Sequence, residues 1–446
     1  MTKLIIFLSS WIIVSTAFGH EIETHVEMSK NAAFGSVLIR PEFLHSLGLK
    51  YAIDSEQQKF KNSNGDSRIV VDLIRDGSRF EDDTDTIKRP LNHFFDPLHD
   101  KPLTVLGVSL GDTSPDWALE SSNEIGSQHY SLRDARDYLY QALTAAPKSD
   151  RDKNFGLAFE TLGHVIHHLQ DMSQPQHVRN DQHLDQPREF FGIIPNPFYN
   201  PSRYEDFTNR NRDKDFVAQY LAPNAYPKVM FSKARDFWHT KARQPEAGCG
   251  IAEFTNANFL SQGTNFVNWS WGDPEAALSP ADYPLPRWNG QTQTRTWAEL
   301  LVEEGVVCDV GSLPGSGCGN ECGPPPELPP ACGLTGKIEF YGTNVVDSHN
   351  PANSGVNPRA STLSIFDQDL KSQGKKLFAL NRFNFEATYP FLIPKAVAYS
   401  AGLIDFFFRG RLEINDVSEM DGVLRIEVCS RAEAVTTSNT KQRRAG

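Results

Sequence analysis

The sequence predicts a mainly α-helical fold with long loops and a short β-like C-terminal tail. In residues 155–172, apolar side chains recur three and four positions apart without an internal proline, until Pro175 ends the pattern. Residues 389–409 form a second long apolar stretch. After residue 410 the short segments LEINDV and VLRIEVCS alternate apolar and polar side chains, as strands do.

The second predicted helix, residues 389–409, is apolar enough to resemble a membrane span. Pro394, Lys395 and Asp405 interrupt it, and charged side chains are costly in lipid. A buried core helix is therefore favoured, and we expect no transmembrane segment in the mature chain.

The charge balance limits the kinds of partner that the protein can bind. The 446-residue chain has 44 basic and 56 acidic side chains, for a formal charge of −12. Binding a long polyanion normally needs a basic stripe, so an extended nucleic-acid interface is disfavoured. A small phosphodiester can still enter a cleft lined by metal ions, because bound cations reverse the local field.

Residues 1–19 are predicted to be a secretory signal peptide. They have a basic start, an apolar stretch that is short for a membrane anchor, and small residues at the end. Cleavage after Gly19 would make His20 the mature N-terminus, whereas cleavage after Ala17 would make it Phe18. We therefore expect a secreted or periplasmic protein.

The cysteines predict disulfides, because their number is even and the chain is exported. Their spacing lacks the paired knuckles of zinc ribbons, so a cysteine zinc site is not expected. Residues 308–336 combine cysteine with proline and glycine, which indicates a disulfide-stapled insertion. Fifteen pairings are possible if all six are bonded: Cys249, Cys308, Cys318, Cys322, Cys332 and Cys429.

One local pattern predicts a metal site. His167 and Asp171 stand four residues apart on a predicted helix and so project from one face, and His177 follows just after the helix end. Imidazole and carboxylate at this spacing suit zinc. The alternative is a polar helix face that contains a buried, hydrogen-bonded histidine.

Four segments resemble the bacterial zinc-dependent phospholipases C, in the same order along the chain. LGHVIHHLQDMSQPQH (residues 162–177) is similar to the helix-and-turn signature of that family at every fixed position. NHFFDP (92–97) resembles the family's SHFYDP, and YEDF (204–207) resembles its YENF. THVEMSKNA (24–32) resembles the N-terminal helix of the family.

The resemblance implies a fold and a domain organisation. Residues 20–412 would form a phospholipase C/P1 nuclease-like multi-helix bundle, in which the final predicted helix closes the bundle and residues 308–336 are an insertion. Residues 413–446 would be a short strand-like tail, and the composition of its last dozen residues predicts disorder.

The resemblance also implies three zinc ions per chain. The first zinc would be held by His93, His167, Asp171 and an aspartate of the RFEDD stretch. We choose Asp82 for that aspartate, with the neighbouring Asp83 as the alternative. The alternative for both acids is a solvated loop.

The second zinc would be held by His177, Glu205 and one further ligand. The family usually places a histidine four residues before this glutamate, but the chain has Pro201 there. His183 is the nearest substitute, because a closed zinc shell needs a third protein ligand. The alternative for His183 is an exposed loop histidine.

The third zinc would be held by the amine and carbonyl of the mature N-terminal residue, by a histidine and by a shared aspartate. His20, His25 and Asp171 would supply these groups. The family usually has tryptophan at the N-terminus, so His20 is a departure, although it is the backbone that coordinates. The alternative is that the first residues are disordered.

The other histidines of these segments are expected to have lesser roles. His164 is interpreted as a packing residue or a support for a ligand, and His168 as a hydrogen-bonded or partly exposed imidazole. His99 and His239 belong to no recognisable group of metal-binding or catalytic residues in the sequence.

The predicted function is a secreted zinc-dependent phosphodiesterase that hydrolyses a phospholipid headgroup ester with metal-activated water. Asp82 would be the catalytic residue that orients or deprotonates the water. This mechanism needs no serine or cysteine nucleophile. Phe80, Phe94 and Phe95 could shape a headgroup pocket, although such aromatic residues more often belong to the core.

Two alternatives remain open: an S1/P1-type single-strand nuclease or nucleotidase, and a non-catalytic zinc-stabilised exported protein. Nucleic acid is therefore an alternative substrate to phospholipid or another small phosphodiester. Contact with a membrane surface would be transient, and we expect a monomer.

Overall fold

The structure is a computed structural model and is mainly α-helical, as the sequence predicts. It describes residues 22–83, 89–105, 107–120, 128–181, 189–190, 194–195, 202–211, 215–241, 249–261, 288–296, 300, 337–356, 358–362, 380–409, 412–420 and 423–430. The predicted signal peptide, the predicted insertion 308–336 and the last residues of the tail lie outside these residues. Most of residues 184–203, which contain four prolines and are expected from the sequence to form an ordered surface loop, also lie outside them.

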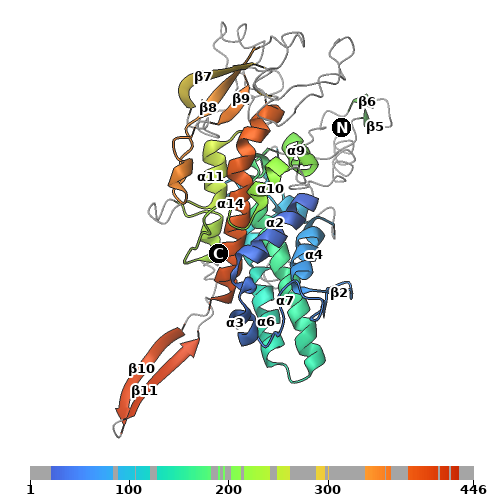
Figure 1. The fold of residues 1–446 in the computed structure, drawn as a ribbon, viewed down its shortest axis with the longest axis vertical. Helices are drawn as coiled ribbons and strands as arrows, with labels where there is room; N and C mark the ends of the chain where they lie inside the picture. The colour runs from blue at the N-terminus through green and yellow to red at the C-terminus, as the bar shows by residue number, and fades with distance from the viewer. Residues whose placement is uncertain are drawn as a thin grey trace, which may run out of the picture.

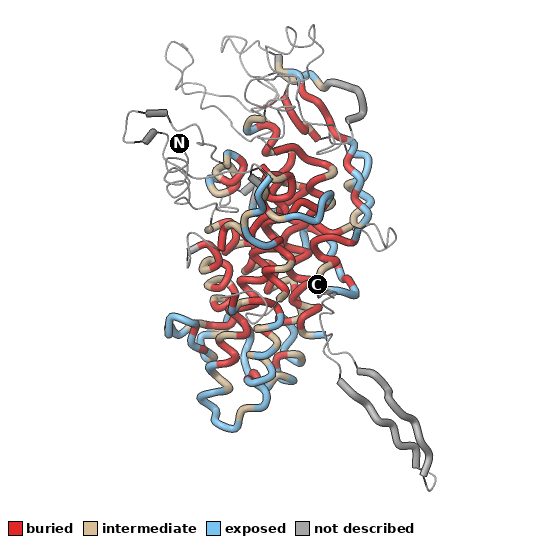
Figure 2. The backbone as a smooth tube through the Cα atoms, turned by 180° about the vertical axis from the view of Figure 1, so that it is seen from behind, coloured by how far each residue is buried: buried red, intermediate tan, exposed pale blue. Residues whose placement is uncertain are grey.

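Five long helices form the body of the protein. Helix α7 packs against α4 and α6, and α2 packs between α4 and α14 (Figure 1). The backbone is buried along the middle of this bundle, whereas its lower end is largely exposed (Figure 2). The five helices are α2 (Ile22–Gly35), α4 (Val70–Asp83), α6 (Leu132–Thr144), α7 (Lys148–Asp171) and α14 (Arg382–Phe408).

Shorter helices connect and cover the bundle. The N-terminal residues of several helices are capped by side chains, including Ser131 at α6, Thr113 at α5 and Asn381 at α14. The shorter helices are η1 (Val37–Ile39), α3 (Pro41–Ser46), η2 (Pro90–Asn92), α5 (Ser114–Leu119), α8 (Pro175–Val178), α9 (Arg203–Asn211), α10 (Asp215–Leu221), η3 (Ala234–Phe237), α11 (Ile251–Asn258) and η7 (Pro351–Asn353).

Helix α7 begins before the predicted residue 155, at Lys148, and its last residue is Asp171. Its first two turns are polar and partly exposed, so they show no apolar periodicity. From Asn154 onward nearly every side chain of α7 is buried. The helix is therefore surrounded by neighbours at the end that carries the predicted ligands.

Helices α4 and α7 approach each other closely because glycines stand at their contact. A Cβ atom on Gly77 would lie 1.8 Å from the main-chain oxygen of Glu160, and one on Gly163 would lie 2.1 Å from the main-chain oxygen of Ile74. No larger residue fits at either position without moving a backbone. This contact brings the end of α4 beside the ligand-bearing turn of α7.

Helix α14 begins at Arg382, before the predicted residue 389, because Asn381 caps it there. Among the described helices it is the one long and apolar enough to cross a membrane, and 89% of its apolar window is buried inside the protein. Lys395, in the middle of α14, is fully buried and lies 3.0 Å from Asp347. This burial is that of a core helix.

The strands are short and peripheral to the bundle. β7 (Trp288–Thr296), β8 (Lys337–Thr343) and β9 (Arg359–Thr362) form a three-stranded antiparallel sheet beyond the upper end of α14 (Figure 1). Three antiparallel pairs are small hairpins: β1 (Phe60–Lys61) with β2 (Ser67–Arg68), β3 (Thr104–Val105) with β4 (Val108–Ser109), and β5 (Glu189–Phe190) with β6 (Ile194–Pro195).

The tail segments that alternate in the sequence form two paired strands. β10 (Leu412–Met420) and β11 (Val423–Ser430) are antiparallel, with a register shift between Ile414 and Asp416. They follow α14 at the end of the molecule away from the three-stranded sheet (Figure 1).

The expected disulfide framework does not include Cys249, which is a free thiol in the structure. Burial is the main reason why the pKa of Cys249 is raised, so the thiol stays protonated. The side chains of the other five cysteines lie outside the described residues.

Candidate metal centre

Seven of the nine predicted metal ligands lie together at one buried place between the helices. Six of them have no exposed surface, and Glu205 is 6% exposed. The other two, His20 and His183, lie outside the described residues. The seven are His25 on α2, Asp82 on α4, His93 after η2, His167 and Asp171 on α7, His177 on α8, and Glu205 on α9.

Four of these side chains point their ligand atoms at a common position. His93 Nδ1 lies 3.5 Å from Asp82 Oδ1 and 3.2 Å from Asp171 Oδ2. His167 Nε2 lies 3.6 Å from Asp82 Oδ1 and 3.5 Å from Asp171 Oδ2. Two ligands bonded at about 2.0–2.1 Å to one tetrahedral zinc lie roughly 3.3–3.4 Å apart. The spacing of the four groups therefore fits one metal ion.

The histidine protons leave lone pairs directed at the carboxylates. The Nδ1 atom of His167 lies 2.8 Å from the main-chain oxygen of Ser78, which can only accept a hydrogen bond. Nδ1 therefore carries the proton, and Nε2 presents its lone pair to Asp82 and Asp171. A lone pair that faces a carboxylate oxygen is repelled unless a cation lies between them.

Two further histidines are held in the same way. His177 Nδ1 donates to the main-chain oxygen of His93 over 2.9 Å, so the lone pair of the neutral ring is on Nε2. His25 Nδ1 lies 2.9 Å from Gln170 Oε1. Hydrogen bonds from the second ring nitrogen typically fix the tautomer and orientation of metal-binding histidines.

Hydrogen bonding gives a direct test of whether a metal fits. Three buried ring nitrogens make no hydrogen bond to the described part of the chain: both nitrogens of His93 and the Nε2 atom of His167. Leaving a buried polar atom without a partner costs about 1–3 kcal/mol. A cation coordinated by His93 and His167 would remove that cost, so the residues present fit a metal.

The electrostatics keep both kinds of ligand in the form that binds metal. Burial is the main reason why the pKa of His167 lies well below its usual value, and His25 lowers it further. Burial opposes ionisation of Asp171, but the histidines around it, His167 and His93 first, together hold its pKa well below its usual range. Asp171 is therefore a carboxylate, as coordination requires.

Asp171 faces two positions at once. Its Oδ2 atom points toward His93 and His167, whereas its Oδ1 atom lies 3.3 Å from His25 Nε2. The His25 ring stacks on the His167 ring with centroids 3.8 Å apart. His25, Asp82 and His167 also have ligand atoms within 4.8 Å of one another. A carboxylate in this arrangement can bridge two metal ions.

His177 and Glu205 form a looser pair beside this cluster. His177 Nε2 lies 3.8 Å from Glu205 Oε1. Helices α8 and α9 are joined by Ser202, whose hydroxyl oxygen lies 3.2 Å from Gln176 Nε2 and 3.3 Å from the main-chain nitrogen of Glu205. The pair can supply two ligands to a further ion.

Sequence reasoning missed Glu81, which is fully buried in the last turn of α4. His164 Nδ1 donates to Glu81 Oε2 over 2.6 Å, and His168 Nε2 donates to Oε1 over 2.9 Å. Burial opposes ionisation, but Arg89 and His168 outweigh it and hold the pKa of the Glu81 carboxyl well below its usual range. The four-residue spacing of His164 and His168 was the available signal, because it puts both on one helix face.

The structure decides the environment of several side chains around the centre. The RFEDD acids Glu81 and Asp82 are buried and not part of a solvated loop. His168 is hydrogen-bonded and buried, not partly exposed. His99 and His239 each have a carboxylate partner that the sequence did not reveal, at 2.6 Å from Asp96 and 3.1 Å from Glu253 respectively.

The two phenylalanines of the NHFFDP segment are core residues. Phe94 is 1% exposed and stacks on the His177 ring at 4.4 Å, and Phe95 is fully buried and lies edge-on to His239. The Phe94 ring packs against the ligand His177, and neither ring is exposed enough to line an open headgroup pocket.

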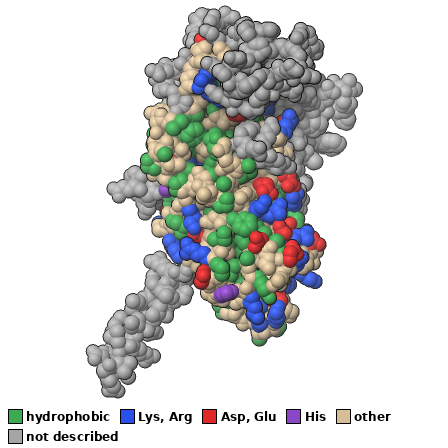
Figure 3. Space-filling model, in the orientation of Figure 1, with side chains coloured by type: hydrophobic (Ala, Val, Ile, Leu, Met, Phe, Trp, Pro, Cys, Tyr) green, Lys and Arg blue, Asp and Glu red, His purple; other side chains and the backbone are tan. Residues whose placement is uncertain are grey.

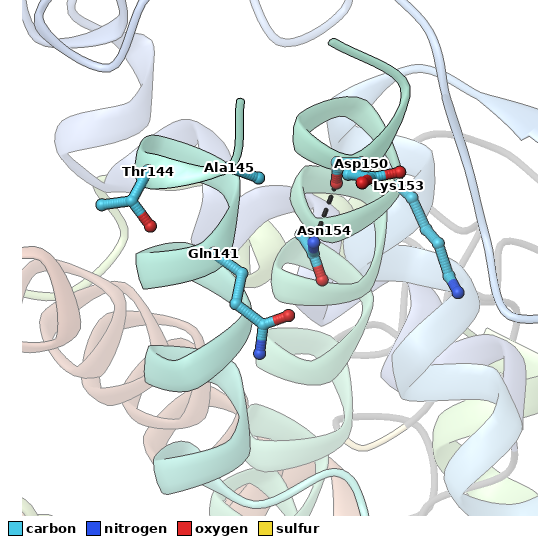
Figure 4. A pocket seen from close by; sticks show the side chains of 6 residues that line it. All are labelled: Gln141, Thr144, Ala145, Asp150, Lys153 and Asn154. Carbon is cyan, nitrogen blue, oxygen red and sulfur yellow. Dashed lines mark hydrogen bonds between the residues drawn. The ribbon is translucent and has the colours of Figure 1, made fainter. Parts of the chain in front are cut away.

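A cavity lies elsewhere, between the end of α6 and the start of α7 (Figure 4). It has a volume of about 440 Å³ and is open and polar. The side-chain nitrogen of Asn154 donates to the main-chain oxygen of Asp150. The chemistry-bearing groups converge at the metal centre and not here. The cavity is lined by Gln141, Thr144, Ala145, Asp150, Lys153 and Asn154.

Comparison of the chain with known proteins finds no matching family model, no similar curated protein and no similar solved structure. What the structure itself defines is a buried cluster of histidine and carboxylate side chains able to hold metal.

Proposed function

We propose that the protein is a zinc-dependent phosphoric diester hydrolase of the phospholipase C kind. The observation that carries this proposal is that ring nitrogens of His93 and His167 each lie 3.2–3.6 Å from carboxylate oxygens of both Asp82 and Asp171. The segments that resemble the zinc-dependent phospholipases C are the ones that meet there. That coincidence of motif and geometry supports the family assignment.

Zinc is the metal that the donor set favours. Imidazole nitrogens and carboxylate oxygens in a tetrahedral arrangement suit zinc, whereas Ca²⁺ and Mg²⁺ prefer all-oxygen shells. The first ion would be held by His93, His167, Asp82 and Asp171. The second would be held by His177 and Glu205, and the third by His25 and the bridging Asp171.

Bound zinc supplies a water activated near neutral pH and Lewis acidity toward phosphoryl oxygens. The residues of the chain do the rest. Asp82 is placed to orient the attacking water or to accept its proton, because its Oδ1 atom faces both His93 and His167. Hydrogen bonds to Ser78 and Gln170 orient the rings of His167 and His25, so that their Nε2 atoms point toward the carboxylates.

A lipid headgroup ester is the favoured substrate over nucleic acid. The net charge is −12, and on the described face in Figure 3 acidic and basic side chains are interspersed without a continuous basic track. The HFFDP and YEDF segments also resemble the phospholipase branch more than the nuclease branch. On this proposal the protein acts outside the cytoplasm as a monomer and touches the membrane surface transiently.

The S1/P1-type nuclease or nucleotidase is the second candidate, because a carboxylate facing two metal positions suits either substrate. A non-catalytic zinc protein is the third. The described residues supply only two ligands to the second ion, and an incomplete shell there favours a protein that binds zinc without catalysis.

One experiment separates these three. The mature protein would be assayed for zinc content and offered a choline phospholipid analogue and single-stranded DNA, each with and without EDTA. Phosphocholine release that EDTA abolishes and zinc restores is the expected result. Acid-soluble nucleotides would instead favour the nuclease, and zinc binding without either activity would favour the structural role. A protein that binds no zinc would overturn the proposal.

A further inference from the structure

Glu81 is a buried carboxylate at the centre of a network of N–H donors. Its Oε2 atom accepts from His164 and from the Arg89 guanidinium, and its Oε1 atom accepts from His168. A fourth nitrogen, His93 Nε2, lies 3.7 Å from Oε1. The network joins three segments: the end of α4, residues 89–93 and the last two turns of α7.

This network is not itself a cation site, although Glu81, His93 and His168 have ligand atoms within 4.8 Å of one another. Arg89 already brings a positive charge to the carboxylate, and it is only 6% exposed. The guanidinium carbon lies 5.5 Å from the Trp117 ring and 5.3 Å from the Tyr130 ring, which hold it in place. A metal ion here would be repelled by a neighbouring buried cation.

His93 differs from the other histidines of the metal centre in how it is held. The rings of His25, His167 and His177 are each fixed through Nδ1 by an oxygen of an amide or the main chain. His93 directs Nδ1 toward Asp82 and Asp171 and Nε2 toward Glu81. It also follows the short helix η2, so no long helix sets the direction of its side chain.

The protonation of His93 follows from this geometry. If Nδ1 coordinates the metal, the proton of the neutral ring must be on Nε2. The acceptor that faces Nε2 is Glu81 Oε1, at 3.7 Å, which is longer than a hydrogen bond of about 2.7–3.2 Å. Every group that faces Glu81 is then a donor, and a carboxylate is the side chain that only accepts.

We propose that Glu81 is a positioning residue for His93: it accepts the Nε2 proton of His93 when metal is bound and thereby fixes this ligand for the centre. His168 fixes the position of the Glu81 carboxylate in turn, because its Nε2 atom donates a hydrogen bond to Oε1. The His168 ring also packs edge-on against the His93 ring, with centroids 4.7 Å apart. The inference rests on the proposed metal centre but not on the identity of the substrate. Removal of such an outer carboxylate typically weakens metal binding by about 10–100-fold.

The test compares Glu81→Gln with the matched variant Glu253→Gln. Glu253 also accepts a hydrogen bond from a histidine, His239, but lies outside the metal centre. Zinc affinity would be measured by competition with a chelating dye, and the ligand field by the visible absorption of the Co²⁺-substituted protein. We expect Glu81→Gln to weaken zinc binding by about 10–100-fold and to change the Co²⁺ spectrum. Glu253→Gln should change neither.

A double-mutant cycle with His93→Gln distinguishes positioning from a general structural role. If Glu81 acts through His93, Glu81→Gln should have little further effect on zinc affinity once His93 is replaced. Additive losses, or wild-type affinity and spectrum in a folded Glu81→Gln protein, would overturn the inference. If Glu81→Gln does not fold, Glu81→Asp takes its place with the same readouts. Wild-type protein that binds no zinc would instead overturn the proposed function.

Discussion

His177 Nδ1 lies 2.9 Å from the main-chain oxygen of His93, although the two residues are 84 positions apart in the chain. The main-chain nitrogen of Phe95 in turn donates to the main-chain oxygen of His177 over 2.9 Å. The two ligand-bearing segments are thus joined by reciprocal hydrogen bonds. One metal ligand is oriented by the backbone of another, so the loop and helix α8 must assemble before the centre exists.

Replacement of a ligand should strongly weaken metal binding without unfolding the protein. We expect His167→Ala to weaken zinc binding by more than the roughly 10–100-fold typical of outer-shell changes, because it removes a direct ligand. Phosphodiester hydrolysis should fall with it. Zinc content after dialysis is the measurement, and His45→Ala, an exposed histidine on α3, is the control. Full zinc occupancy in His167→Ala would contradict the assignment of this ligand.

The close approach of α4 and α7 should depend on Gly77. Gly77→Ala places a Cβ atom 1.8 Å from the Glu160 main-chain oxygen, so the helices must separate. We expect the free energy of unfolding to fall by about 1–3 kcal/mol. Zinc affinity should also fall, because Ser78 on the same helix orients His167.

The control for this variant is Arg79→Ala, on the same helix but at its partly exposed side. It removes a surface ion pair with Glu23, which is worth at most about 1 kcal/mol. Chemical denaturation of the two variants and the wild type would measure their free energies of unfolding. Equal stability of Gly77→Ala and the wild type would show that the helices tolerate the extra carbon.

Lys395 should be a major determinant of stability. It is fully buried, donates to Tyr226 over 2.7 Å, and lies 3.8 Å from the centre of the Phe254 ring. Lys395→Met leaves the Asp347 carboxylate buried without its cation, which should cost about 3–5 kcal/mol.

The double variant Lys395→Met/Asp347→Asn should regain part of that loss, because the uncompensated charge is gone. Thermal and urea denaturation of both variants would measure it. A double variant that is no more stable than the single one would show that packing and not charge sets the effect.

The acid stability of the apo protein should depend in part on Glu253. Burial alone would raise its pKa, but the His239 hydrogen bond and the backbone N–H groups of Thr240 and Gly250 outweigh burial and lower it from 4.5. A lowered folded-state pKa adds stability that is present above the unfolded value and lost as pH falls through the folded value. Glu253→Gln lacks this titration.

The stability difference between wild type and Glu253→Gln should therefore shrink as pH falls from about 6 to about 3. Urea unfolding in the presence of chelator, at several pH values, measures it without interference from metal. A stability difference that grows as pH falls would show that the pKa of Glu253 is not lowered in the folded protein.

Helix α7 shows most clearly which features of the fold the sequence predicts. Its apolar periodicity predicts the buried half of the helix, but the polar turns before Asn154 carry no such signal, so the start at Lys148 was missed. At the metal centre, the spacing of His167 and Asp171 predicts that they share a helix face. The roles of His93, Asp82 and Glu205 come only from resemblance, since these residues are distant in the chain.

The sequence by itself determined the mainly helical character, the buried final helix and the residue types that can bind metal, because periodicity and spacing are local properties. Only the tertiary structure decided that Asp82 faces His93 and His167, that Asp171 faces two positions, and that Glu81 gathers Arg89, His164 and His168. These relationships depend on how closely α4 and α7 approach and on where the loop 89–93 lies. Such distances arise from packing between segments that are far apart in the chain, and no local pattern records them.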